Sequence, residues 1–187
     1  PDGPKILAST LRVEAAAAQN GAQPLTVGQS GCCPKWSPKG DAIAYLRSDG
    51  IDYHIRKFGT IDQRETTLTA AGVARTAYSI APYDLSSSIF DWSPDGTKVV
   101  YVSKRSGRYN LWIAAADGSG EEMATNLGDG EAAVSGLWSP DGTKIAFVIA
   151  GGSGSPTVSK DNRLAVLEAG TVTVLADFPG QMRVLGW

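Results

Sequence analysis

One short motif recurs along the chain and constrains its fold more than any other feature. Complete copies begin at Trp36, Trp92 and Trp138; the first reads Trp-Ser-Pro-Lys-Gly and the other two read Trp-Ser-Pro-Asp-Gly. Each copy is followed by an apolar stretch, and truncated copies lie at residues 1–7 and 185–187. The copies are separated by roughly 50 residues, which is the length of one unit of a repeat protein built from four-stranded sheets.

The turn in this motif has a conformational reason for each residue. Proline presets the backbone of a tight turn, Asp95 and Asp141 accept hydrogen bonds from nearby backbone N–H groups, and Gly96 and Gly142 supply the positive φ that closes it. Lys39 stands where the other copies have Asp, so the turn of that copy is expected to lack one carboxylate acceptor.

The tryptophans and the stretches after the turns are predicted to form the packed part of each unit. The stretches are rich in β-branched and aromatic residues, as buried strands require. Large indole rings just before the turns are expected to pack between neighbouring units. The predicted structural tryptophans are Trp36, Trp92, Trp138 and Trp187.

Turn signals divide the rest of each unit into further short strands. Asn20-Gly21 and Asp117-Gly118 each separate two such stretches, and these dipeptides are strong hairpin signals. In this register the alanine run at 15–18 is predicted to be a strand, despite its helix propensity. The chain is therefore predicted to be an all-β domain, or part of one: a β-propeller of four-stranded antiparallel blades. Its four blade equivalents are counted as 1–35, 36–91, 92–137 and 138–187.

These repeats resemble the TolB-type, WD-repeat-like propellers, whose blades carry Trp-Ser-Pro-Asp-Gly before an apolar strand. The resemblance covers essentially the whole chain. It implies that the turn joins the innermost strand of a blade to the second strand. It also implies a protein-binding role in the periplasm or cell envelope of a bacterium, although the residues themselves carry no localisation signal.

The truncated motif copies at the two ends leave three arrangements open. In the family, the last strand often completes the first blade and so removes exposed edges. The chain is expected to be a piece of a larger propeller, half of a ring completed by a second copy in a homodimer, or a closed four-bladed ring.

Charge and hydropathy exclude two classes of partner. The 17 basic and 19 acidic residues give a net charge of −2 and form no basic block, so no nucleic-acid partner is predicted. No apolar run approaches twenty residues, so no membrane span is predicted. The first residues, 1–5, lack an initiator Met and a signal-peptide core, and the native N-terminus is expected to lie upstream.

No residues point to catalysis, and no cofactor or metal site is predicted. His54 is the single histidine, and it is more typical of a packed or surface residue than of a catalyst. The Gly-rich stretch at 151–155 breaks the nucleophile-elbow pattern at its last position. Asp95, Asp117, Asp129 and Asp141 lack the spacing of a calcium loop and are interpreted as turn residues. The chain is therefore predicted not to be an enzyme.

Cys32 and Cys33 are the one unusual pair of residues. Adjacent cysteines can close a vicinal disulfide or bind a soft metal with help from elsewhere. The favoured interpretation is two thiols on the strand that enters the Trp36 turn, pointing to opposite faces.

The leading hypothesis is a non-catalytic propeller that presents loops to a protein or peptide partner. Tyrosine and arginine dominate interface hot spots, which marks a set of aromatic and charged loop residues as candidates. The candidate binding residues are Tyr53, His54, Tyr83, Arg105, Arg108 and Tyr109. The alternative is the propeller portion of a prolyl-oligopeptidase-like serine peptidase, or of a carbohydrate-active propeller enzyme; both would resemble this chain in their blades.

Overall fold

The computed structural model describes residues 10–13, 25–29, 31–70, 72–73, 90–151, 161–179, 184 and 186–187, and all regular structure within them is β. The described part of the chain contains no helix that is long and apolar enough to cross a membrane. The predicted strand at the alanine run 15–18 and the loop at 152–155 lie outside the described residues.

The strands form four antiparallel sheets in chain order. The first sheet pairs β1 (Thr10–Val13) with β2 (Leu25–Gln29). The second sheet contains β3 (Gly31–Trp36), β4 (Ala42–Ser48), β5 (Tyr53–Gly59) and β6 (Glu65–Thr67). The third sheet contains β7 (Phe90–Trp92), β8 (Lys98–Ser103), β9 (Asn110–Ala115) and β10 (Glu121–Met123). The fourth sheet contains β11 (Ala132–Trp138), β12 (Lys144–Gly151), β13 (Asp161–Glu168) and β14 (Thr171–Pro179).

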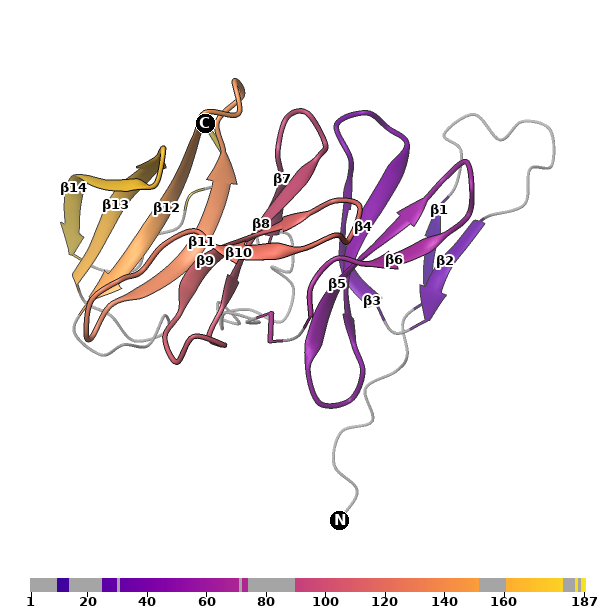
Figure 1. The fold of residues 1–187 in the computed structure, drawn as a ribbon, viewed down its shortest axis with the longest axis horizontal. Coiled ribbons are helices and arrows are strands. Elements are labelled where there is room, and N and C mark those ends of the chain that lie inside the picture. Colours follow the sequence, from indigo (N-terminus) through magenta and orange to yellow (C-terminus); the bar gives the residue numbers. More distant parts are fainter. Residues whose placement is uncertain are drawn as a thin grey trace, which may run out of the picture.

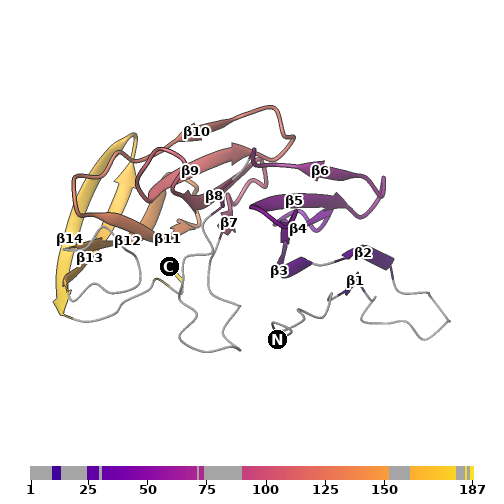
Figure 2. The ribbon, with the colours of Figure 1, turned by 90° about the horizontal axis from the view of Figure 1, so that it is seen from below.

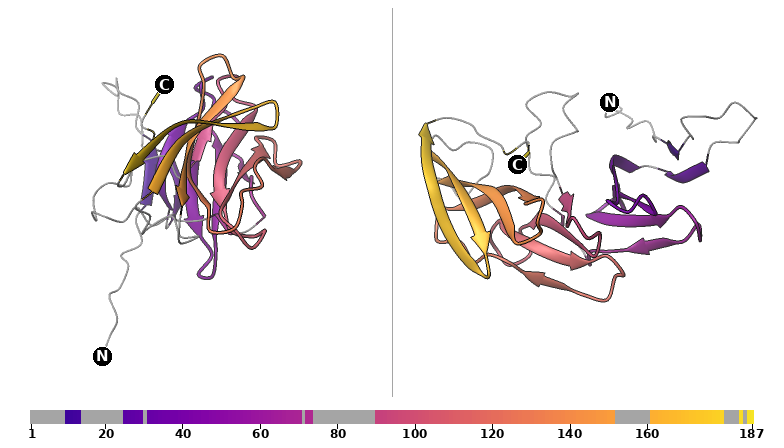
Figure 3. Two further views of the ribbon diagram at one scale, coloured as in Figure 1. Left: turned by 90° about the vertical axis from the view of Figure 1, so that its left-hand side faces the viewer. Right: turned by 90° about the horizontal axis from the view of Figure 1, so that it is seen from above.

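The sheets follow one another along an arc. Figure 1 shows them side by side from β1 and β2 to β14, and Figures 2 and 3 show β3, β7 and β11 on the concave side with β6, β10 and β14 on the convex side. Each four-stranded sheet is a meander that steps outward, strand by strand, from the concave side. This confirms the prediction of four-stranded antiparallel blades.

The hydrophobic core lies between the sheets. One cluster joins Leu46 and Ile55 of the second sheet to Phe90 and Tyr101 of the third. Another cluster joins the third sheet to Ile145, Phe147 and Ile149 of the fourth. The second strand of each four-stranded sheet, β4, β8 and β12, is thus buried on both of its faces, which explains its near-continuous apolar sequence.

Trp92 packs in the interface between the second and third sheets, as predicted for the motif tryptophans. Its side chain is 5% exposed, and its indole N–H donates to the carbonyl oxygen of Lys35, 3.3 Å away. Trp187 forms the same kind of bond against the fourth sheet, two sheets further along, where its indole N–H donates to the carbonyl oxygen of Leu137 at 3.0 Å. Trp36 is different, since 54% of its surface is exposed. Identical motif positions therefore differ widely in burial.

The Ser-Pro turns use a serine and an aspartate to hold the backbone. In the third sheet, Ser93 Oγ donates to Asp95 at 2.6 Å and accepts from the backbone N–H of Lys98 at 2.9 Å. Asp95 also accepts from the backbone N–H of Thr97 at 3.1 Å, and Gly96 has φ +66°. The turn at Ser139 repeats these bonds through Asp141.

The turn with Lys39 does not lack a carboxylate acceptor, which corrects the sequence-based expectation. Ser37 Oγ donates to Asp41 Oδ1 at 2.5 Å, and Asp41 stands where the other turns have threonine. The carboxylate of this turn therefore comes from Asp41, two residues after the position that holds aspartate in the other two copies. The bond to the serine is kept, because the turn brings both positions within reach of the same hydroxyl.

The cysteine pair lies in β3, and both side chains are half-buried; neither forms a disulfide with a residue that the structure describes. Cys32 packs against the core between the second and third sheets. Cys33 has φ +60° in a β-bulge that shifts the register between Cys32 and Lys35. The simple strand alternation expected for the pair is interrupted at this bulge.

Each sheet begins with the strand that ends on the motif tryptophan. The second, third and fourth sheets start at Gly31, Phe90 and Ala132, whereas the sequence units were counted from one tryptophan to the next. The turn accordingly joins the first and second strands of a sheet, as the family resemblance implies.

Candidate functional site

The predicted binding residues gather at one end of the sheets. This hairpin end consists of the β4–β5 hairpin (residues 49–52), the β8–β9 hairpin (residues 104–109) and the connectors at 68–70, 72–73 and 124–131. The Ser-Pro turns lie at the opposite, turn end (Figure 1). Tyr53 and His54 begin β5, and Arg105, Arg108 and Tyr109 lie in the β8–β9 hairpin. Tyr83 lies outside the described residues.

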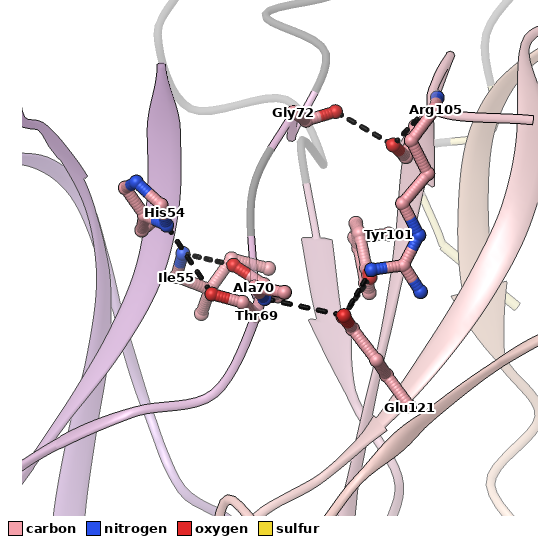
Figure 4. Close-up of polar contacts among 9 residues, drawn as sticks. His54, Ile55, Thr69, Ala70, Gly72, Tyr101, Arg105 and Glu121 are labelled. Atoms are coloured by element: carbon pink, nitrogen blue, oxygen red, sulfur yellow. Dashed lines mark hydrogen bonds and ion pairs between the residues drawn. The ribbon is translucent and has the colours of Figure 1, made fainter. Parts of the chain in front are cut away.

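His54 ties its strand to the connector that follows the same sheet (Figure 4). Its Nδ1 lies 3.2 Å from the carbonyl oxygen of Thr69, and its Nε2 lies 3.0 Å from Asp49 Oδ2. The backbone N–H of Ile55 donates to Thr69 Oγ1 at 3.0 Å. Both partners of the imidazole are acceptors, so it satisfies both only as the donor at each nitrogen.

Asn110 holds the equivalent position in the third sheet. Its Oδ1 accepts from Thr125 Oγ1 at 3.0 Å and from the backbone N–H of Leu127 at 2.9 Å, and Thr125 in turn accepts from the N–H of Leu111. The side chain is almost completely buried. His54 and Asn110 therefore perform the same task, which is to fasten the connector to the sheet.

Arg105 joins the third sheet to the second through Glu121 (Figure 4). Its guanidinium stacks 3.6 Å from the centroid of the Trp112 ring and forms an ion pair with Glu121. The same carboxylate accepts from the hydroxyl of Tyr101 and, at 3.2 Å, from the backbone N–H of Ala70. Burial opposes ionisation, but the bonds from Tyr101 and Arg105 hold the pKa of Glu121 below its ordinary value.

A tyrosine and a glutamate twenty residues apart recur in the second sheet. Tyr45 donates to Glu65 at 2.8 Å, as Tyr101 does to Glu121. Burial, followed by the bond to the carboxylate, raises the pKa of Tyr45 to about 12 and raises that of Tyr101 further. This equal spacing is a sequence signal for Glu65 and Glu121 that the sequence analysis missed.

Arg108 braces the other side of the β8–β9 hairpin. It pairs with Asp129 and donates to the carbonyl oxygen of Leu127 at 3.1 Å. Lys104 Nζ lies 5.3 Å from the centroid of the Tyr109 ring, which is half-buried against the core. Tyr53 packs in the same way against the core of the preceding interface. The arginines are thus engaged with their own sheet, and the exposed surface is supplied by the hairpin tips.

Ile51 is the most exposed large apolar side chain at this end, and the sequence analysis did not single it out. It is 91% exposed at the tip of the β4–β5 hairpin. Asp49 Oδ1 accepts from the backbone N–H groups of Ile51 at 2.9 Å and Asp52 at 2.8 Å. These bonds, with the bond to His54, hold the pKa of Asp49 well below its ordinary value. An ordered turn therefore presents Ile51 to solvent.

Among the described residues, no three His, Cys, Asp or Glu side chains gather in a way that could hold a metal ion. Asp95, Asp117 and Asp141 accept hydrogen bonds within their own turns, as the sequence analysis interpreted them, and Asp129 pairs with Arg108.

Solved structures of propeller proteins resemble this chain, and no family model matches it. A putative TolB from Agrobacterium tumefaciens is similar over 86% of this chain and 55% of its own, with 24% identity and a TM-score of 0.63. The β-propeller domain of the Trilobed protease from Pyrococcus furiosus is similar over 81% of this chain and 43% of its own, with 12% identity and a TM-score of 0.52. This chain has the fold of a partial β-propeller.

An oligogalacturonate lyase from Vibrio parahaemolyticus shares the same architecture. The similarity covers 92% of this chain and 47% of the lyase, with 12% identity and a TM-score of 0.61. The chain thus spans about half of the length of the TolB and lyase structures that it matches. At these identities the likeness concerns the fold, which hosts both enzymes and other proteins.

Proposed function

We propose that this chain is the propeller portion of a non-catalytic scaffold that binds a protein or peptide at the hairpin end. The observation that carries the proposal is Ile51, an apolar side chain 91% exposed on a turn that Asp49 holds in place. Ordering the turn in advance lowers the entropy lost on binding. An apolar anchor surrounded by polar groups is typical of interface hot spots.

Charge supports the same surface. The β4–β5 hairpin carries Asp49 and Asp52, while the neighbouring β8–β9 hairpin carries Lys104 and Arg108. A partner with complementary charges would be oriented by these hairpins as it approaches, because electrostatic complementarity sets register and association rate. The resemblance to TolB-type propellers supports a partner from the bacterial envelope.

Affinity capture from a bacterial envelope extract tests the proposal with a matched pair of variants. Ile51→Ser removes the anchor at the hairpin end, and Ile61→Ser removes an isoleucine that is 86% exposed in the turn after β5, at the opposite end. We expect a protein to be captured by the unmodified chain and by Ile61→Ser, with recovery reduced at least ~10-fold for Ile51→Ser, measured by quantitative mass spectrometry.

Two results would contradict the proposal: no protein captured by the unmodified chain, or equal recovery by both variants. Sedimentation of the purified chain is measured in parallel, because a second copy is the other protein partner that the repeat allows.

A second candidate function is the propeller module of a serine peptidase. It rests on the likeness to the Trilobed protease domain, which has this fold. The complete reading frame decides between the two, since the peptidase function requires a hydrolase domain encoded beside these blades.

A further inference from the structure

A polar cleft lies at the turn end, between the second and third sheets and away from the hairpin end. Its volume is about 330 Å³, at the lower limit of small-molecule sites. We call it the turn-end cleft; its lining residues include Ser37, Asp41, Lys57, Asp62, Arg64, Thr66 and Trp92. The β9–β10 turn approaches β6 so closely that a Cβ at Gly118 would lie 3.0 Å from both the side chain of Thr66 and the backbone of Thr67.

The repeat provides an internal comparison for this cleft. The third sheet has a more open recess of about 280 Å³ at the equivalent place, lined by Ile113, Ala115 and Gly120. Lys57 pairs with Ala44 in the second sheet, and Ile113 pairs with Val100 in the third. This register makes Lys57 and Ile113 equivalent positions of the repeat. Val166 of the fourth sheet pairs with Ala146 in the same way. An apolar residue is thus sufficient to form the blade at this position. Among the three four-stranded sheets, only the second has a lysine there.

Arg64 departs from the repeat in the same manner. Its carbonyl oxygen accepts from the N–H of Gly59 at 2.9 Å, just as that of Gly120 accepts from Ala115. Glycine suffices at this position in the third sheet. Two cations have therefore been placed in one cleft at positions where the fold does not require them.

The two cations are the groups in the cleft that remain available to a ligand. The side chains of Lys57 and Arg64 form no hydrogen bond or ion pair with any residue that the structure describes, although Lys57 lies in the field of Asp41 and Asp117. The carboxylates are already engaged. The hydroxyl of Ser37 donates to Asp41, and this bond lowers the pKa of the Asp41 carboxyl. The backbone N–H of Arg64 donates to Asp62 at 3.1 Å.

We propose that the turn-end cleft binds a small carboxylate-bearing ligand, with Lys57 and Arg64 as its charge partners. Arginine matches a carboxylate with two parallel N–H groups, while lysine supplies a point charge. Thr66 of β6, which pairs with Lys57, and Trp92 of β7 also line the cleft, and the indole adds an apolar surface. The site is independent of the proposed scaffold function, since none of its residues lies at the hairpin end.

The test is calorimetric titration of the purified chain with three probes: galacturonate, the dipeptide N-acetyl-Ala-Glu and inorganic phosphate. Lys57→Ile and Arg64→Gly install the residues of the third sheet, so both variants are expected to fold. Lys98→Ala is the matched control, because it removes a lysine from the third-sheet recess and installs the alanine found at position 42. Circular dichroism verifies folding of each variant.

We expect at least one of the two carboxylates to bind and phosphate to bind at least ~10-fold more weakly, since the sugar ring or the peptide can also pack on the indole of Trp92, which inorganic phosphate cannot do. Lys57→Ile and Arg64→Gly should each weaken that binding at least ~10-fold, while Lys98→Ala leaves it unchanged. The preferred carboxylate distinguishes an acidic sugar from an acidic peptide. Absence of binding by both carboxylates, equal binding of phosphate, or an equal effect of Lys98→Ala would overturn the proposal.

Discussion

The second sheet has Lys57, Arg64 and His54 at positions where the third sheet has Ile113, Gly120 and Asn110. The central strands β4 and β8 of the same two sheets are both apolar and buried. These three polar or charged residues lie outside the buried strands β4 and β8, at places where side chains reach solvent or a connector. The comparison teaches that the repeat maintains the packing between sheets, while the two ends are free to acquire binding groups.

The largest predicted difference in stability between equivalent positions concerns the motif tryptophans. Trp92→Ala should lower the free energy of unfolding by about 3–5 kcal/mol, because it opens a cavity between the second and third sheets. Trp36→Ala should lower it by less than about 1 kcal/mol, since its side chain is 54% exposed. Urea denaturation measures both. Equal losses would mean that the position in the motif, and not the burial of the side chain, sets how much each tryptophan contributes to the free energy of unfolding.

An intermediate effect concerns the two residues that fasten the connectors. Asn110→Ala should cost about 2–3 kcal/mol, because it leaves the N–H of Leu127 and the hydroxyl of Thr125 buried without an acceptor. His54→Ala should cost about 1 kcal/mol, as its partner Asp49 is half exposed.

His54→Asn is the control for this pair, because it installs the residue of the third sheet. It should retain most of the stability of the unmodified chain in the same urea titration. If His54→Asn were as destabilising as His54→Ala, the two connectors would not be fastened in the same way.

The smallest effect is the response of the turns to acid. Bonds from Ser93 and then Thr97 lower the pKa of Asp95 to about 2, and the equivalent bonds lower that of Asp141 to about 2. A carboxyl whose pKa is lowered in the folded state stabilises the fold above its unfolded pKa, and this contribution is lost as the pH falls from about 4 to about 2.

Asp95→Asn should therefore reduce the loss of stability between about pH 5 and about pH 2.5. Asp41→Asn should reduce it less, because Asp41 receives fewer bonds in the turn of the second sheet. Unfolding free energies at the two pH values check this order, and the reverse order would refute the comparison of the turns.

The repeat was sufficient to predict the sheets, because each of its signals is local. Proline and glycine set the turns, and alternating apolar stretches set the strands, so the four-stranded blades follow from residues close together in the chain. The same local information predicted that Asp95 and Asp141 hold their turns. It also marked Tyr53, His54, Arg105, Arg108 and Tyr109, which the fold brings to one end.

The roles of these residues needed the tertiary structure, because their partners come from other parts of the repeat. Arg105 looked like a binding residue, yet it is engaged by Glu121 and Trp112. The carboxylate at Asp41 compensates for Lys39 because a turn folds the two positions together. Ile51 carried no sequence signal, since a single isoleucine between two aspartates does not reveal its exposure.

The sequence by itself determined the architecture of this protein: a motif that repeats in register dictates repeated sheets, and tryptophan and proline spacing requires no knowledge of distant contacts. Only the tertiary structure decided which copies of a motif residue are buried and which ends carry free charges. Lys57 and Arg64 lie on either side of the turn between β5 and β6, and nothing in the sequence shows that they share a site. The antiparallel pairing of β5 with β6 and the packing of the third sheet beside them place both in one cleft.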